Sequence, residues 1–192
     1  MRSTNPKGST HTPAPPLYEP LPPVTSNEVY ICAEHISKLC TDNMGRFPIR
    51  SCIGNQYIML AYHCDINTIL VGTFKYKNDR HHITAYNSIM IRLKQRGHTV
   101  NLQLLDNKSS NKYRRVITEE CKSDYQLVPP DVHRRNTSER AIRTFKAHLL
   151  ALLSGINPAF PDYLWDKLLH QTELILNLLH QATLAPHLSA WD

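Results

Sequence analysis

Three acidic residues are spaced along the chain where they could act together. Asp42 and Asp106 each follow a short apolar run directly, and Glu139 opens a helical stretch that comes after a further apolar run. In an open α/β sheet, functional sites collect at the carboxyl ends of strands, so these side chains should converge. Converging carboxylates repel one another unless a hard cation such as Mg²⁺ or Mn²⁺ lies between them. The pattern therefore indicates a site for two metal ions, suited to in-line attack on a phosphodiester.

Each acid taken alone has a simpler explanation. An aspartate that precedes asparagine, as Asp42 and Asp106 both do, is most often a turn or capping residue. Glu139 follows Asn136 by three residues, and such a pair can close a capping box at the start of a helix. The metal-site interpretation therefore depends on the shared topology of the three acids.

The hydrophobic pattern predicts the elements that must bring the acids together. Extended segments are predicted at residues 29–31, 36–40, 57–63, 68–74, 100–105 and 125–128, and helices at 81–96, 112–120, after 136 and at 162–180. Asp42–Gly45 is predicted to be a turn that ends the first strand. The order predicts an α/β fold with a mixed five-stranded sheet, three antiparallel strands followed by two parallel strands, flanked by helices.

Two of the expected helices have apolar faces. The first should bury Ile142, Phe145, Leu149 and Leu152. In the last helix, the shared face is predicted to contain Trp165, Leu168, Leu169, Ile175 and Leu179, widened by Leu174 and Leu178. A helix that is apolar on more than one side belongs to the core or to a subunit interface.

The composition of the chain indicates how many domains it forms and which class of partner it binds. The 192 residues are 41% hydrophobic, which predicts one folded domain at 29–192, preceded by a proline-rich disordered linker at 1–28. The net charge of +6 and the pI of about 9.1 favour a polyanionic partner, nucleic acid before an anionic membrane surface. Five irregularly spaced cysteines indicate reduced thiols, and no apolar run is long enough to cross a bilayer.

Basic and polar residues surround Glu139 and could hold DNA phosphates beside the metal ions. They are His133, Arg134, Arg135, Asn136, Arg143 and Lys146.

Several segments also carry a family resemblance. They are Thr41–Pro48, Gly54–Met59, Leu104–Asn107, Val132–Arg140, Pro161–Trp165 and Leu188–Trp191. From about residue 38 onward, the chain resembles the integrase catalytic core of LTR retrotransposons. The resemblance implies a ribonuclease-H-like fold, and it places the metal-binding catalytic triad on Asp42, Asp106 and Glu139. It also implies an enzyme that trims cDNA ends and joins them to target DNA, acting as a homo-oligomer. Because the genome would be the substrate of this chemistry, the expected location is the nucleus.

The sequence departs from that family at some points. Lys108 and two serines follow Asp106, where small or acidic residues are usual, so an ammonium group is expected near the metal ions. The zinc-binding module upstream and the DNA-binding module downstream of such cores are not visible. The chain is therefore expected to be an isolated core, truncated at its C-terminus, from a polyprotein or a decayed copy.

Two alternatives remain open. One is a non-catalytic module, derived from a retroelement, that binds nucleic acid or serves in assembly. The other is a different ribonuclease-H-like nuclease that cuts RNA in hybrids, although the residues from Asn136 to Arg140 favour an integrase.

Overall fold

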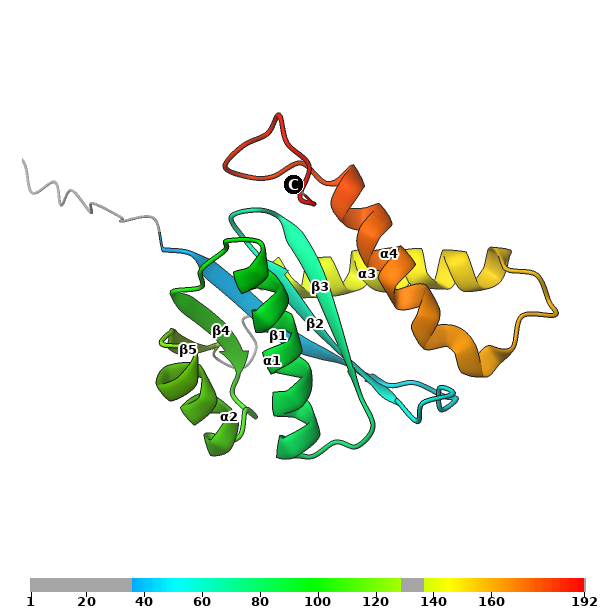
Figure 1. Cartoon of the computed structure of the whole chain (residues 1–192), viewed down its shortest axis with the longest axis horizontal. Helices are drawn as coiled ribbons and strands as arrows, with labels where there is room; N and C mark the ends of the chain where they lie inside the picture. Colours follow the sequence, from blue (N-terminus) through cyan, green and yellow to red (C-terminus); the bar gives the residue numbers. More distant parts are fainter. Residues whose placement is uncertain (1–35, 129–136, 192) are drawn as a thin grey trace, which may run out of the picture. The chain divides into compact units, whose positions relative to one another are not determined.

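A mixed β-sheet lies between two layers of helices in the computed structural model, which describes residues 36–128 and 137–191 (Figure 1). The strands are β1 (Lys38–Arg46), β2 (Tyr57–His63), β3 (Thr68–Phe74), β4 (Leu102–Asp106) and β5 (Asp124–Val128). The helices are α1 (Asp79–Gln95), α2 (Asn111–Arg115), the π-helical η1 (Val116–Glu120), α3 (Thr137–Gly155), the 3-10 turn η3 (Asp162–Leu164) and α4 (Trp165–Leu179).

The strands follow the order β3-β2-β1-β4-β5 across the sheet. The β1–β2 and β2–β3 pairs are antiparallel, whereas β1–β4 and β4–β5 are parallel. Because β4 returns beside β1, the chain must cross over one face of the sheet through α1. The predicted mixed five-stranded α/β fold is confirmed.

Alternate residues of the central strands pack into two separate hydrophobic cores, one on each face of the sheet. Met59 and Ala61 of β2 belong to the core under α1, α2 and η1. Ile58 and Leu60 belong to the core under α3 and α4 on the opposite face. Successive side chains of a strand point to opposite faces, so a sheet covered on both sides needs apolar residues at every position.

Gly72 of β3 sets the close approach of α1 to the sheet. A Cβ atom added at Gly72 would lie 3.0 Å from the carbonyl oxygen of Ala85 and 3.2 Å from its Cβ. Both Ala85 atoms belong to a well-packed helix, and moving either of them would cost packing energy. A residue without a side chain is therefore required at this crossing of α1 and β3.

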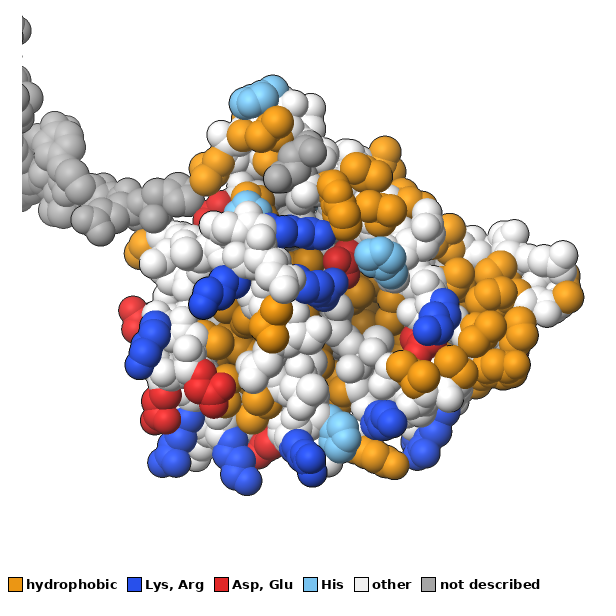
Figure 2. All heavy atoms as spheres, in the orientation of Figure 1, with side chains coloured by type: hydrophobic (Ala, Val, Ile, Leu, Met, Phe, Trp, Pro, Cys, Tyr) orange, Lys and Arg blue, Asp and Glu red, His pale blue; other side chains and the backbone are white. Residues whose placement is uncertain are grey.

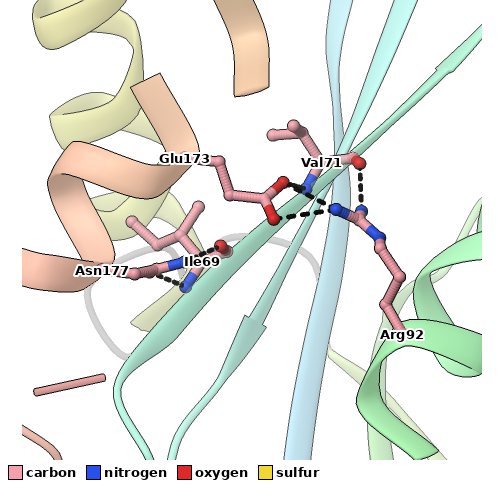
Figure 3. Close-up of polar contacts among 5 residues, drawn as sticks. All are labelled: Ile69, Val71, Arg92, Glu173 and Asn177. Atoms are coloured by element: carbon pink, nitrogen blue, oxygen red, sulfur yellow. Dashed lines mark hydrogen bonds and ion pairs between the residues drawn. The ribbon is translucent and has the colours of Figure 1, made fainter. Parts of the chain in front are cut away.

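The outer edge of β3 is covered by side chains instead of by a sixth strand (Figure 3). Asn177 accepts a hydrogen bond from Ile69 N at 2.8 Å and donates one to Ile69 O at 2.7 Å. Glu173 accepts from Val71 N at 2.9 Å and from Arg92 Nη1 at 2.8 Å, and Arg92 Nη2 donates to Val71 O. The backbone groups of two edge residues are thus satisfied by α4 and α1, which removes a template for pairing with another chain.

The first strand is longer than predicted, because Asp42–Gly45 is not a turn. β1 continues to Arg46, and its register against β2 shifts between Asn43 and Arg46. Gly45 has a φ of +90°, a conformation that glycine adopts without strain. The prediction was wrong because a glycine that suits a turn also suits a β-bulge, and β2 supplies the pairing that extends the strand.

The buried face of α4 also differs from the prediction. Trp165 and Leu169 are buried as expected, but Leu178 and Leu179 are 52% and 71% exposed. Three polar residues of α4 are buried, namely Thr172, Glu173 and Asn177, and the last two hydrogen-bond to β3. The apolar residues of α4 did not predict its buried face, because the sheet edge beneath this helix presents backbone groups that need hydrogen-bond partners.

Two further predictions fall on described residues, and two fall outside them. The helix predicted at 112–120 forms as α2 followed by η1, and Leu152 is half-buried. The extended segment predicted at 29–31 and the linker at 1–28 lie outside the described residues. Within the described ranges, no helix combines the length and apolarity needed to span a bilayer.

Candidate active site

Asp42 and Asp106 lie on adjacent parallel strands. The register between β1 and β4 pairs Cys40 with Leu104, and each aspartate follows two residues later on its own strand. Residues in register on parallel neighbours point to the same face of the sheet. Asp106 is the last residue of β4, so the pair lies at the carboxyl end of that strand.

The carboxylate of Asp42 is coupled to both other predicted acids. Burial raises the pKa of Asp42 above its ordinary value, and the negative charges of Asp106 and Glu139 raise it further. The hydrogen bond from Asn43 N to Asp42 Oδ1, 2.6 Å long, and the charge of Lys146 act in the opposite direction. Three carboxylates from β1, β4 and α3 therefore share one electrostatic environment, and a bound cation would relieve the repulsion among them.

A cleft of about 640 Å³ opens beside two of the acids. Its walls include Asp42 and Asp106, whereas Glu139 does not line it. Three cations also line the cleft, namely Arg46, Lys77 and Lys108. In Figure 2, Lys and Arg side chains follow the lower edge of the molecule, where α1 begins and α2 lies. The cleft thus combines a carboxylate pair with the positive charge that a phosphate group requires.

The wall of the cleft formed by α1 was not anticipated from the sequence. Asn78 caps this helix by accepting a hydrogen bond from His81 N at 3.0 Å, and His82 in the next position lines the cleft. Asn43 Nδ2 donates to His82 Nε2 at 3.2 Å. Burial lowers the pKa of His82, which favours the neutral ring that accepts this bond. The capping pattern Asn78-Asp79 was the available sequence signal.

A buried hydroxyl contact holds the strand beneath Asp42 in position. The hydroxyl groups of Thr41 and Tyr113 share a hydrogen bond of 3.1 Å, and both residues are buried. The ring of Tyr113 also meets the rings of His82 and Tyr86 edge to face, at 4.6 and 5.0 Å. Thr41, His82 and Tyr113 all line the cleft, so this contact joins β1, α1 and α2 in its wall.

The predicted DNA-binding residues divide into two groups. Arg143 and Lys146 are exposed on α3, and Lys146 is close enough to Asp42 for its charge to lower the pKa of that carboxyl. The other four, His133, Arg134, Arg135 and Asn136, lie outside the described residues.

The acids do not form a ready metal cage. Among the side chains that the structure describes, no three His, Cys, Asp or Glu residues are close enough together to hold a metal ion. Charge coupling acts over a longer range than coordination, so it is compatible with this finding. The assignment of Asp42, Asp106 and Glu139 as metal ligands and catalytic residues stays a prediction.

Comparison with solved structures identifies the fold. A chain of the simian T-cell lymphotropic virus intasome superposes with a TM-score of 0.62 at 14% sequence identity, covering 86% of this chain and 59% of that one. The catalytic core domain of BIV integrase superposes with a TM-score of 0.54 at 14% identity, covering 80% and 90%. The described chain has the fold of a retroviral integrase catalytic core.

A second integrase catalytic core domain superposes about as well as that of BIV. The HTLV-2 catalytic core domain, solved as a dimeric form in complex with magnesium, gives a TM-score of 0.55 at 14% identity and covers 80% of this chain and 92% of that one. The integrase-core fold here thus spans most of the isolated core domains but 59% of the intasome chain. No protein-family model and no curated protein sequence matches the chain.

Proposed function

We propose that the chain is the catalytic core of a retroelement integrase, a metal-dependent polynucleotidyl transferase that joins element cDNA ends to target DNA. The observation that carries the proposal is that Asp42 and Asp106, on adjacent parallel strands, line one cleft of a sheet with integrase-core topology, with the charge of Glu139 close enough to raise the pKa of Asp42. Like charges gathered beside a basic cleft have a functional use when a divalent cation and a phosphate enter together.

The donor set fits Mg²⁺ or Mn²⁺, since hard cations prefer carboxylate oxygens. Asp42, Asp106 and Glu139 would hold two ions, and a bound cation would remove the charge repulsion that, together with burial, raises the pKa of Asp42. Such ions would supply activation of a water or a 3′-hydroxyl group for attack on the phosphodiester and would stabilise the leaving oxygen.

The protein's own cations would orient the DNA. Lys77 and Lys108 at the cleft can each bind a backbone phosphate, and Arg143 and Lys146 extend the positive surface along α3. Lys108 follows Asp106 closely, so it can pair with a phosphate oxygen on the reacting group or compete with the metal for Asp106. His133, Arg134, Arg135 and Asn136 are proposed to complete the DNA contact.

The remaining partners follow from the same proposal. Apolar side chains remain exposed at the end of α4 and in the segment after it, as Figure 2 shows, and they include Leu178, Leu179, Leu184 and Leu188. This surface supports a homo-oligomer. The folded domain is proposed to span 29–192, and because its DNA substrate is the genome, the proposed location is the nucleus.

A second candidate function is a non-catalytic module that binds DNA or assists assembly. It is favoured by one observation, namely that the described residues contain no group of three donors within coordination distance. Both candidates predict DNA binding, and they differ in whether metal-dependent products form.

The decisive experiment is a nicking and strand-joining assay on oligonucleotide DNA with Mg²⁺ or Mn²⁺. The chain is compared with Glu139→Gln, which removes a charge at nearly constant shape. The matched control is Asp124→Asn, an exposed acid at the start of β5, at the opposite end of that strand pair from Asp106. We expect products from the chain and from the control, and their loss in Glu139→Gln with DNA affinity retained.

The opposite results separate the candidates. Equal product from the chain and Glu139→Gln would remove this glutamate from the mechanism. If neither forms product while both bind DNA, the non-catalytic module is favoured. Adding flanking integrase modules in trans would then test whether the core was incomplete.

A further inference from the structure

Two cysteine thiols face each other across β1 and the end of β2. Cys40 Sγ and Cys64 Sγ are 3.8 Å apart and share a hydrogen bond. Cys40 pairs with Tyr62 in the antiparallel ladder, and Cys64 follows Tyr62 by two residues, so both thiols belong to one face of the sheet. Cys64 N donates to Lys38 O at 2.9 Å, which fixes the backbone beside the pair.

Cys64 is the more accessible partner, and its thiol has a lowered pKa. Cys40 is 1% exposed, whereas Cys64 is half-buried. The hydrogen bond with Cys40 lowers the pKa of Cys64, and the charge of Lys38 acts in the same direction, against burial and Asp65. Because the thiolate is the nucleophile in thiol exchange, reaction with a small molecule should begin at Cys64.

The other described cysteines lack a comparable arrangement. Cys52 is exposed, and its backbone N–H donates to Tyr163 O. Cys121 shares a side-chain hydrogen bond with Tyr86. Cys52 therefore provides an internal reference for reaction with solvent thiols and disulfides.

We propose that Cys40 and Cys64 form a reversible disulfide by exchange with a small-molecule disulfide of the glutathione type. The thiolate of Cys64 attacks one sulfur of oxidised glutathione, which forms a mixed disulfide and releases one glutathione thiolate. Cys40 then loses its proton to solvent and attacks the Cys64 sulfur, which releases the second glutathione thiolate. Two protein thiols are oxidised and one glutathione disulfide is reduced to two thiols.

The geometry requires only a small adjustment. The two sulfur atoms must approach from 3.8 Å to the disulfide bond length of about 2.0 Å, a change within the reach of side-chain rotation. The bond would join β1 to the end of β2 only two residues before Asp42. It would also fix the residue whose carbonyl accepts a hydrogen bond from Thr183 of the C-terminal segment.

The test equilibrates the full chain in glutathione buffers of increasing oxidised fraction. Remaining thiols are alkylated at each step, and the peptides are mapped by mass spectrometry without reduction. We expect a linked peptide containing Cys40 and Cys64, at a level exceeding the glutathione adduct on Cys64 by roughly tenfold or more, because the second thiol is held in place. Reduced glutathione should reverse the link.

Three variants complete the design. Cys64→Ser should abolish the link, whereas Cys52→Ser should leave it unchanged. Cys32→Ser, a change outside the described residues, should also preserve the link. The proposal is overturned if Cys64 accumulates as a glutathione adduct while Cys40 stays alkylatable, if Cys40 links to Cys32, or if only Cys52 reacts.

Discussion

The ion pair between Arg92 and Glu173 offers a quantitative test of how α4 is attached. Glu173 is 1% exposed and Arg92 is 30% exposed, so the two charges differ in their access to water. Arg92→Met leaves a buried carboxylate without its cation, and we expect it to cost about 3–5 kcal/mol. Glu173→Gln retains the shape and an acceptor for Val71 N, so we expect about 1–2 kcal/mol.

The double variant measures the pair directly. The double variant Arg92→Met/Glu173→Gln has no buried carboxylate. Its loss in free energy of unfolding should therefore be smaller than the sum of the two single-variant losses by about 1–3 kcal/mol. For a chain of this size, the Arg92→Met loss corresponds to a fall of roughly 10 °C in melting temperature.

Urea unfolding gives all four free energies. Circular dichroism reports the helices. Tryptophan fluorescence, measured in a Trp191→Phe background so that only Trp165 emits, reports the attachment of α4, because Trp165 is fully buried at the start of that helix. Coincident transitions would establish that one free energy describes both probes. Two results would refute the reasoning: single-variant losses in free energy of unfolding that simply add in the double variant, or a larger loss for Glu173→Gln than for Arg92→Met. In either case, the unequal burial of the two charges would not control the stability of the ion pair.

Three further predictions address other parts of the chain. Gly72→Ala should destabilise the fold by about 1–3 kcal/mol, measured by urea unfolding, because its Cβ would meet α1. Burial holds the pKa of His63 below its ordinary 6.5, so below pH 6.5 the unfolded state binds more protons than the folded state. The free energy of unfolding should therefore fall as the pH drops below 6.5. Melting curves measured over this pH range should show a smaller fall for His63→Gln. Replacing Arg143 and Lys146 by alanine should weaken DNA binding and lower the salt slope by about 1–2, whereas Lys94→Ala on α1 should not alter it.

Local patterning was sufficient for much of the sheet and for α1. β2 and β3 have the predicted bounds, because turn-forming residues lie between two continuous apolar runs. α1 begins within two residues of the predicted start, because its apolar residues repeat at helical spacing. Where propensity, period and capping point to one structure, the sequence suffices.

Nonlocal pairing explains what the patterns could not supply. The extension of β1 through Asp42 depends on the partner β2, and the bulge at Gly45 exists only in that pairing. The polar face of α4 depends on the unpaired edge of β3, more than 100 residues away. The cleft wall containing His82 likewise arises from the meeting of α1 with β1.

The topology brought Asp42 and Asp106 to one cleft as expected, because the carboxyl end of β4 lies beside β1. The distances among the three acids could not be predicted, since they depend on where α3 begins and on the charges around it. A sequence specifies which groups face one another more readily than it specifies their separation.

The covering of β3 by α4 also has a consequence during synthesis. Ile69 and Val71 precede their partners on α4 by 108 and 102 residues, so the ribosome releases the whole edge strand long before Glu173 and Asn177 exist. An uncovered strand edge is a template for intermolecular pairing. Nascent chains stalled before α4 should therefore recruit chaperones or aggregate, whereas those that have released α4 should close the edge on themselves.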